Sequence, residues 1–398
     1  MEQDLGALIR TDAVHRSVYT DPAIFDLEME RIFGRTWVFL GHTSEIREAG
    51  DYKTTHIGRH PIILSRLSDG GVAALFNRCR HRGATVCQHE LGNSRFFRCA
   101  YHGWTYANSG RLIGVPHPAG YGPSFAREEL GLARVPRVAI HRGFIFGSLT
   151  AKGPSLDEHL GGTKTLIDEF CEVSPTGEIE VFPGYQKCAY DGNWKYQVEN
   201  GVDPYHVQHL HRSTFTEQAL KIYSEAKGLV VDMDGHGVTD HRDTGPLPPD
   251  GNPSGGFNVV IFPNLVLLRT QIRTIRPISV NRTEIYTNVV RLQNVPEELN
   301  IRRLRSQQFE FGPAGVVYAD DLEIFERTQE GLQSAAVEWL MFSRGLCREK
   351  MHGKYLSSTM SDETQHRGMY RHWKQLMTAA QSSDEASGAA GERVQDGR

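Results

Sequence analysis

The stretches Cys79-Arg80-His81 and Cys99-Ala100-Tyr101-His102 each offer one thiolate and one imidazole, and 17 residues separate them. Four metal ligands can therefore meet between two neighbouring loops. A [2Fe–2S] cluster with two cysteines on one iron and two histidines on the other needs this ligand set, and imidazole in place of thiolate raises its reduction potential. The two stretches predict an electron-relay site.

A structural zinc site is the rival interpretation, because Cys₂His₂ also suits tetrahedral Zn²⁺. Cysteines pair with each other in the usual zinc finger, whereas each loop here mixes a cysteine with a histidine. Gly83 and Gly103 can adopt backbone angles that fold each loop back around a cluster, and Trp104 can shield it from water. A non-catalytic, zinc-stabilised binding protein stays open as an alternative of another class.

The run Asn77-Arg78-Cys79-Arg80-His81-Arg82-Gly83, followed by Cys99-Ala100-Tyr101-His102-Gly103-Trp104, resembles the Rieske domain of aromatic ring-hydroxylating oxygenases. The resemblance extends from about residue 20 to about residue 375. It implies that Cys79, His81, Cys99 and His102 hold a Rieske [2Fe–2S] cluster. Rieske proteins of respiratory complexes carry an extra cysteine pair in these loops, which this sequence lacks.

A length of 398 residues suits two or three domains. Short β-prone runs between turn residues predict a small all-β domain, and later runs of strands and then helices predict an α+β domain. The fold class is therefore α+β, with a small all-β Rieske domain before a larger α+β catalytic domain whose antiparallel sheet is flanked by helices. The predicted boundaries are 1–36 for an N-terminal helical segment packing with the catalytic domain, 37–154 for the Rieske domain, 155–379 for the mononuclear iron domain and 380–398 for a disordered tail.

Charge and composition favour an ordinary enzyme over a nucleic-acid or membrane protein. The formal net charge is −4 and the pI is about 6.5, so nothing attracts nucleic acid or an anionic membrane. Met1-Glu2-Gln3-Asp4 lacks the start of a signal peptide, and no stretch approaches the roughly 20 apolar residues of a membrane span. We expect a cytoplasmic protein in which the remaining cysteines, Cys87, Cys171, Cys188 and Cys347, are reduced.

The sequence has no Gly-x-Gly-x-x-Gly fingerprint after a strand and no phosphate loop. It therefore offers no visible site for NADH or flavin. Electrons must come from a separate NAD(P)H-dependent reductase, with or without a ferredoxin.

A second metal site is indicated between Glu199 and His211, on a helix predicted over Trp194–His211. Iron(II) oxygenases use two histidines and one carboxylate on one face of the metal. Positions five apart on a regular helix are rotated by roughly 140°, so helix geometry favours His206 with His209. The family pattern Asp-x-x-His-x-x-x-x-His implies His206 and His211 instead. For that pair the helix must be distorted or must end between the two residues.

The third ligand follows Gly312-Pro313-Ala314-Gly315, a stretch that resembles the family and ends in the pair Asp320-Asp321. An Asp pair at this place is otherwise a common helix N-cap. The resemblance implies that Asp321 binds the mononuclear Fe(II). It also implies that Asp203 connects His206 of one subunit to His102 of the neighbour, and hence a trimer.

Glu199-Asn200 also matches the family, and Asn200 and Asp203 are the candidate catalytic residues. The short form Glu-Asn-Gly-x-Asp-x-Tyr-His resembles the benzoate, anthranilate and salicylate group, which implies an aromatic carboxylate as substrate. The planar fork of arginine suits carboxylate. Arg269 and Arg273 share a face of a predicted strand while Arg276 points away; similar terephthalate-type enzymes anchor substrate with an arginine at about the position of Arg273.

These inferences predict a terminal oxygenase component that uses reductase-derived electrons and O₂ to hydroxylate or cis-dihydroxylate an aromatic ring. A Rieske monooxygenase, acting by salicylate-type ring hydroxylation or O-demethylation, is the alternative, because the metal motifs are shared. The expected assembly is a homotrimer or an α₃β₃ complex with a small beta subunit.

Overall fold

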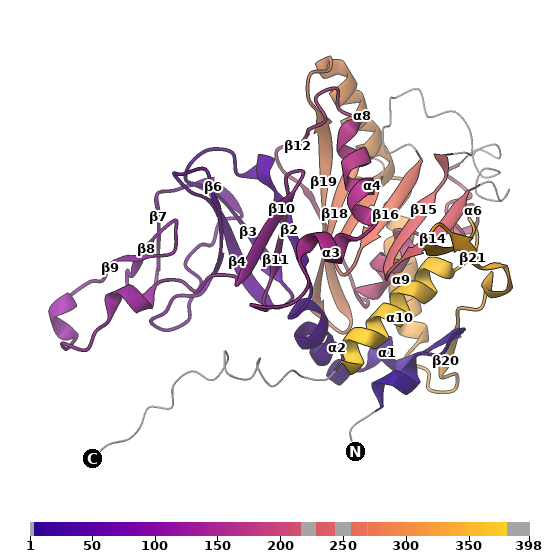
Figure 1. Ribbon diagram of the computed structural model, residues 1–398, viewed down its shortest axis with the longest axis horizontal. Coiled ribbons are helices and arrows are strands. Elements are labelled where there is room, and N and C mark those ends of the chain that lie inside the picture. Colours follow the sequence, from indigo (N-terminus) through magenta and orange to yellow (C-terminus); the bar gives the residue numbers. More distant parts are fainter. Residues whose placement is uncertain (1–3, 216–227, 243–255, 269, 380–398) are drawn as a thin grey trace.

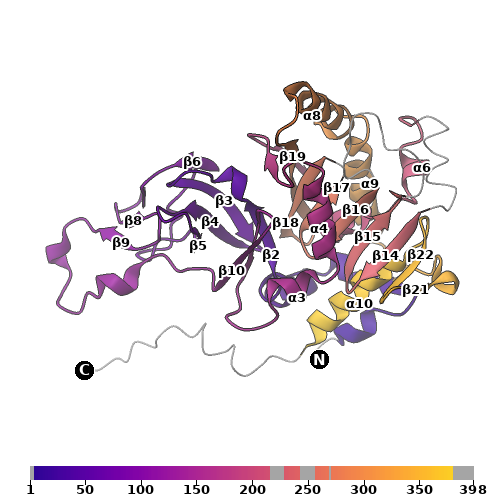
Figure 2. The same cartoon turned by 45° about the horizontal axis from the view of Figure 1, so that its top comes forward.

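The computed structural model describes residues 4–215, 228–242, 256–268 and 270–379. They form a small all-β lobe and a larger lobe built on one broad antiparallel sheet (Figures 1 and 2). The predicted α+β fold class is confirmed. The predicted disordered tail, 380–398, lies outside the described residues.

The small lobe consists of three short antiparallel sheets, at the left of Figure 1. Alternate side chains of the strands between residues 51 and 114 enter one core, which contains Tyr52, Ile63, Leu75, Phe97 and Tyr106. The four-stranded sheet comprises, in spatial order, β5 (Val72–Phe76), β4 (His60–Arg66), β3 (Asp51–Ile57) and β6 (Leu91–Asn93). The three-stranded sheets comprise β7 (Phe96–Arg98), β8 (Thr105–Ala107) and β9 (Leu112–Gly114), and β10 (Arg137–His141), β11 (Phe144–Ser148) and β2 (Val38–His42).

The broad sheet of the larger lobe is antiparallel throughout. Its strands are, in spatial order, β12 (Ile179–Val181), β19 (Arg282–Leu292), β18 (Gln271–Ser279), β17 (Leu265–Leu268), β16 (Phe257–Ile261), β15 (His236–Asp240), β14 (Leu229–Met233), β22 (Tyr355–Thr359) and β21 (Lys350–His352), with β13 (Gln186–Tyr190) also paired to β19. A separate two-stranded ribbon joins β1 (Ala13–His15) to β20 (Trp339–Met341).

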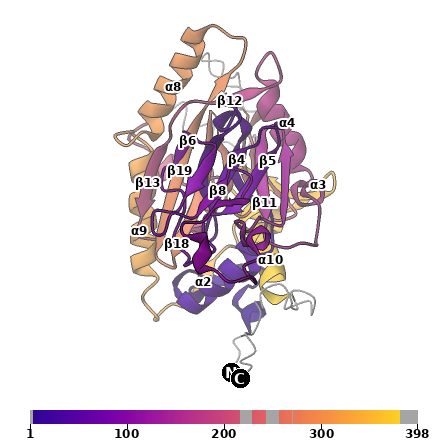
Figure 3. The ribbon, with the colours of Figure 1, turned by 90° about the vertical axis from the view of Figure 1, so that its left-hand side faces the viewer.

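Helices cover both faces of this sheet, as Figure 3 shows. Side chains of one strand alternate between the two faces. Val259 and Ile261 of β16 belong to the same core as Phe170 of α4. Val260 belongs to the core on the opposite face, with Tyr318 of α9. The first layer is α3 (Leu156–Leu160) and α4 (Thr163–Glu172); the remaining helices are α1 (Ser17–Thr20), α2 (Pro22–Glu28), α5 (Lys195–Asn200), α6 (Val207–Leu210), α8 (Glu297–Phe311), α9 (Tyr318–Gly331) and α10 (Thr364–Thr378). Among the described helices, none has the length and apolar character needed to cross a membrane.

The single helix predicted over Trp194–His211 is wrong. Helix α5 ends at Asn200, and α6 begins only at Val207. Pro204 lacks a backbone N–H and disfavours helical angles at Asp203. The Asp203 carboxylate instead accepts a hydrogen bond from the Tyr205 N–H at 2.8 Å, a local turn that competes with helix.

The N-terminal segment is fixed to the larger lobe by a buried charge. Glu28 of α2 and Lys195 of α5 are fully buried and lie 2.7 Å apart. The indole N–H groups of Trp194 and Trp373 donate to the same carboxylate, at 2.8 Å and 2.7 Å. One carboxylate therefore joins α2, α5 and α10.

We predict that Glu28→Gln destabilises the larger lobe by about 3–5 kcal/mol, because Lys195 becomes a buried cation without a counter-charge. The loss should appear as a lower midpoint of chemical unfolding followed by tryptophan fluorescence. Glu30→Gln, at an exposed glutamate two residues further along the chain, should leave the midpoint unchanged. Equal midpoints for both variants would contradict the predicted role of Glu28.

Candidate functional site

The two cysteine–histidine loops have the same local geometry. Cys79 accepts a backbone hydrogen bond from Gly83, and Cys99 accepts one from Gly103, both at 2.9 Å. The N–H of each cysteine is also bonded within its loop, to the carbonyl of Ala84 or Trp104, at 2.8 Å. Both glycines have positive φ, 80° and 69°, which explains the glycine in each motif.

These loops pair the two predicted histidine ligands and bury the two predicted cysteine ligands in the small lobe. Cys79 and Cys99 are buried, and the rings of His81 and His102 lie 4.6 Å apart between centroids. Trp104 stacks on His81, with ring centroids 5.1 Å apart and planes 6° apart. The buried His81 Nδ1 has no hydrogen-bond partner. Two thiols, two imidazoles and an unpartnered ring nitrogen fit a two-iron cluster.

A buried tyrosine completes the surroundings of the cluster loops. The Tyr106 hydroxyl lies 3.2 Å from Cys79 Sγ and accepts a hydrogen bond from the Arg80 N–H. Its proton is therefore free to point at the sulfur. Burial and the neighbouring Cys79 raise the pKa of Tyr106 well above its ordinary value, so the hydroxyl keeps that proton. Hydrogen bonds to cluster sulfurs tune the reduction potential.

The second site lies where the end of α6 meets the first turn of α9. His206, His211 and Asp321 each offer a ligand atom, and these atoms lie within 4.8 Å of one another. His211 Nε2 is 3.1 Å and His206 Nε2 is 3.6 Å from the same Asp321 oxygen. Helix α6 ends at Leu210, with His211 as its C-cap, so both imidazoles can face one point. Two histidines and one carboxylate match the donor set of an Fe(II) site.

Asp203 lies behind His206. Its carboxylate is 3.2 Å from His206 Nδ1. Burial opposes protonation of the imidazole, but the hydrogen bond and charge of Asp203, with the charge of Asp321, raise the pKa of His206. The same contact lowers the pKa of Asp203 against the effect of burial. The carboxylate therefore holds the Nδ1 proton and leaves Nε2 for a metal.

Asn200 and Asp320 also contact the three metal-donor residues. The Asn200 amide donates to Asp321 at 3.0 Å and lies 3.3 Å from His206 Nε2. Asp320 lies 3.3 Å from His211 Nδ1. A contact between Asp320 and a histidine ligand was not predicted from the sequence. The Asp320-Asp321 pair could have indicated this contact. Adjacent residues on a helix point about 100° apart, so an acid next to a metal ligand can contact the far side of another ligand.

His209 does not join the metal-donor group. It is exposed, and its ring lies against Tyr205 with centroids 5.6 Å apart. His209 is in helical register with His206, whose carbonyl accepts a hydrogen bond from the His209 N–H at 3.0 Å, but its side chain points to solvent.

A buried hydrogen-bond network fixes the end of α5, which carries Asn200. Glu199 accepts hydrogen bonds from the hydroxyls of Tyr19, at 2.8 Å, and Tyr370. Burial raises the pKa of the Glu199 carboxyl. Its backbone carbonyl is 3.1 Å from His366 Nε2. The N-terminal segment and α10 therefore both hold the residue next to Asn200.

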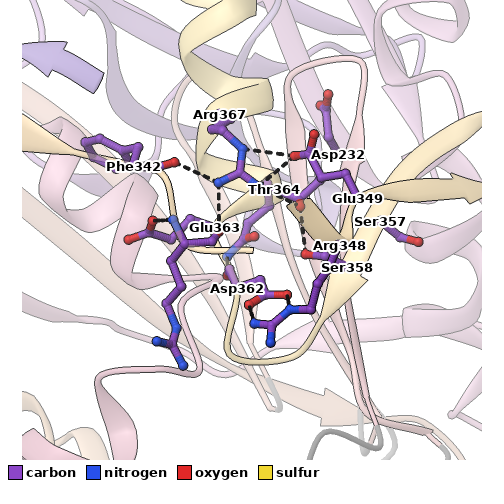
Figure 4. Close-up of polar contacts among 12 residues, drawn as sticks. Asp232, Phe342, Arg348, Glu349, Ser357, Ser358, Asp362, Glu363, Thr364 and Arg367 are labelled. Carbon is purple, nitrogen blue, oxygen red and sulfur yellow. Dashed lines mark hydrogen bonds and ion pairs between the residues drawn. The ribbon is translucent and has the colours of Figure 1, made fainter. Parts of the chain in front are cut away.

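A second network, around Arg367 of α10 (Figure 4), fixes Arg344 beside the turn that carries Asp203. Arg367 of α10 is buried and donates to the carbonyls of Phe342 and Arg344, at 2.7 Å and 2.8 Å, and to Glu349. Arg344 is thereby held with its guanidinium 4.0 Å from the ring centroid of Tyr205. Tyr205 donates its N–H to Asp203 in this turn and directly precedes His206.

Arg273 is buried in the larger lobe, on the same sheet face as α9. Its guanidinium lies 4.6 Å from the ring centroid of Tyr318 and 4.8 Å from that of Phe311. Its Nε donates to Gln271 at 2.8 Å, while the buried Nη2 has no hydrogen-bond partner. Arg276 instead pairs with Glu284 at 2.9 Å. Arg269 lies outside the described residues.

Comparison with known proteins identifies the class of this chain. Residues 36–135 match the family "Rieske [2Fe-2S] domain", and residues 180–379 match the family "Ring hydroxylating alpha subunit (catalytic domain)". A Rieske domain joined to a catalytic domain with a His-His-Asp mononuclear iron site defines a Rieske non-heme iron oxygenase. The chain belongs to the family of aromatic ring-hydroxylating oxygenase alpha subunits. The predicted enzyme class and cofactors are confirmed, and the zinc-protein alternative is excluded.

Similar proteins extend over nearly the whole chain. The 2-halobenzoate 1,2-dioxygenase large subunit of Burkholderia cepacia is 35% identical over 83% of this chain and 79% of its own. Toluate 1,2-dioxygenase subunit alpha of Pseudomonas putida is 34% identical over 92% and 91%. A solved structure of naphthalene 1,2-dioxygenase with indole bound aligns with a TM-score of 0.86 and 27% identity, over 95% of each chain. The domain boundaries given above stay predictions.

Proposed function

We propose that Cys79, His81, Cys99 and His102 hold the Rieske cluster, and that His206, His211 and Asp321 hold the mononuclear Fe(II). When bound, the cluster supplies single electrons and the Fe(II) activates O₂ for ring hydroxylation. The observation that carries this assignment is the convergence of three ligand atoms within 4.8 Å. Asn200 orients the Asp321 carboxylate through its amide, and Asp203 holds the Nδ1 proton of His206.

We predict that His206→Ala lowers the iron content from about three atoms per chain to about two, because a two-iron cluster and one single iron are expected. Inorganic sulfide and the rhombic EPR signal of the dithionite-reduced cluster should be unchanged. The matched control is His209→Ala, which should keep all the iron. Loss of the single iron from His209→Ala, with retention in His206→Ala, would reverse the assignment.

The proposed reaction is dioxygenation of an aromatic carboxylate to a cis-dihydrodiol. The two relatives above are named after 2-halobenzoate and toluate, which are both aromatic carboxylates. Incubation with substituted benzoates under ¹⁸O₂ tests the reaction. Two labelled oxygen atoms in the product support dioxygenation, whereas one labelled atom favours the monooxygenase alternative.

Arg273 supports a negatively charged substrate. A buried guanidinium is costly unless a counter-charge or hydrogen bonds compensate it. The contacts described for Arg273 are two aromatic rings and a neutral amide, with one nitrogen left unpartnered. A carboxylate of the substrate would accept a hydrogen bond from that nitrogen. Tyr318, which contacts Arg273, lies one helical turn before Asp321, so the anchor adjoins the iron site.

We predict that Arg273→Gln raises the KM for a benzoate by at least about 30-fold, because a buried charge contact worth 2 kcal/mol or more is lost. Steady-state kinetics with a benzoate and with a neutral arene would separate charge recognition from general damage, since only the benzoate should be affected. Arg276→Gln, at the arginine already paired with Glu284, serves as the control. An equal loss for both substrates would rule out carboxylate anchoring.

We also propose that the chain works in a head-to-tail ring of three. Strands β7 and β8 flank the second cluster loop, and they lie at the opposite side of the molecule from helix α6 (Figure 1). Residues 37–154 contain 15 of the 44 Lys and Arg residues of the chain, but only 7 of its 48 Asp and Glu residues. That segment therefore carries a net charge of +8 and the remainder −12, which favours contact between the small lobe of one copy and the large lobe of the next.

Asp203 is the proposed contact between copies. It is partly exposed behind His206, and His102 is exposed at the tip of its loop. A separate reductase, with or without a ferredoxin, would supply the electrons. The relatives are named as large or alpha subunits, which supports a second, small subunit and an α₃β₃ assembly.

We predict that Asp203→Asn leaves both metals bound but slows the reoxidation of the reduced cluster by O₂ in the presence of substrate. The expected loss is about 10–100-fold, in line with the effect of residues that orient metal ligands. Stopped-flow absorbance of the chemically reduced protein measures this rate without a reductase. Glu363→Gln removes a charge close to Asp203 and should have a smaller effect. Unchanged turnover in Asp203→Asn would defeat the proposed bridge.

A further inference from the structure

The imidazole of His211 lies between two consecutive acids of α9. Its Nε2 is 3.1 Å from Asp321, and its Nδ1 is 3.3 Å from Asp320. The His211 side chain is 2% exposed, compared with 21% for His206, the other candidate histidine ligand. Each nitrogen of this buried ring therefore has its own carboxylate.

These contacts determine which nitrogen faces the metal. Nε2 is the nitrogen that faces Asp321, the third member of the metal-donor group, so it is the ligand atom. The remaining proton of a neutral imidazole then lies on Nδ1 and is donated to Asp320. A carboxylate in that position fixes the orientation of the ring and makes the ligand nitrogen more basic.

The backbone keeps these groups together. Asp320 and Asp321 lie in the first turn of α9, where side chains of adjacent residues point about 100° apart. One acid can therefore face the metal position while the other faces the back of His211. The Thr214 hydroxyl, three residues after His211, donates to the Val316 carbonyl at 3.0 Å, which ties the end of α6 to the segment leading into α9.

We propose that Asp320 is a positioning residue for His211 and that it sustains metal affinity at the mononuclear site. The inference rests on the ligand set proposed above. It gives the two acids behind the histidines different roles. Asp203 is placed at the proposed contact between copies, whereas Asp320 acts within one chain, so the orientation of His211 does not depend on assembly.

A purely structural role for Asp320 makes a different prediction. An acid in the first turn of a helix stabilises that helix through its dipole, by about 0.3–1 kcal/mol. Removing such an acid lowers the stability of the fold and leaves the metal site unchanged. Positioning of His211 instead changes the affinity for metal and the spectroscopic signature of the bound ion.

The test uses the full chain with its cluster intact and oxidised, after a chelator has removed the mononuclear iron. Co²⁺ is titrated by calorimetry and observed by EPR, in which the oxidised cluster is silent. Asp320→Ala should bind Co²⁺ about 10–100-fold more weakly than the unmodified protein, with an altered Co²⁺ signal. Asp320→Asn, which keeps an acceptor oxygen without the charge, should fall between the two. Glu323→Gln, on the exposed side of the same helix, should match the unmodified protein.

The outcomes separate this inference from the proposed function. Unchanged Co²⁺ affinity in Asp320→Ala, with a lower unfolding midpoint, would overturn the positioning role and leave the ligand set intact. Absence of Co²⁺ binding in the unmodified protein would overturn the ligand set itself. Asp320→Asn, nearly the same size as the original residue, keeps the test decisive if Asp320→Ala does not fold.

Discussion

The buried contact between Glu28 and Lys195 is the constraint on which the rest of the larger lobe depends. Its two charges come from segments 167 residues apart in the sequence, and neither can stay buried without the other except at a large free-energy cost. Helix α5, which carries Lys195, ends at Asn200, beside the donors of the iron site. The N-terminal segment therefore acts as part of the catalytic scaffold, although it lies far from the iron ligands in sequence.

The arrangement of the two lobes separates electron supply from oxygen chemistry. The cluster loops lie at the far end of the small lobe, and the iron donors lie between α6 and α9 (Figure 1). In the proposed ring, a neighbouring copy brings its cluster loops to these donors, guided by opposite charge. The chemistry would then belong to the assembly, while the ligands, the carboxylates behind them and the Arg273 anchor would belong to each chain.

Local spacing predicted the cluster loops well, because each cysteine and histidine pair lies on one short turn whose geometry the intervening residues determine. Helix periodicity favoured His209 over His211, since it could not include the end of helix α6 at Leu210. Contacts between residues far apart in the sequence could not be predicted from these local patterns. Asp320 meets His211 across 109 residues, and the burial of Arg273 requires rings from α8 and α9. Such contacts depend on tertiary packing, which residue patterns do not encode locally.

The matching hydrogen bonds of the two cluster loops have a consequence for the speed of electron transfer. In each loop the cysteine is bonded through both its N–H and its C=O, and the loop closes at a glycine. The backbone that carries the cysteines is therefore held independently of the oxidation state of the metal. Ligands that move little when an electron arrives require little nuclear reorganisation. A small reorganisation energy lowers the activation barrier, so these loops favour rapid electron exchange at modest driving force.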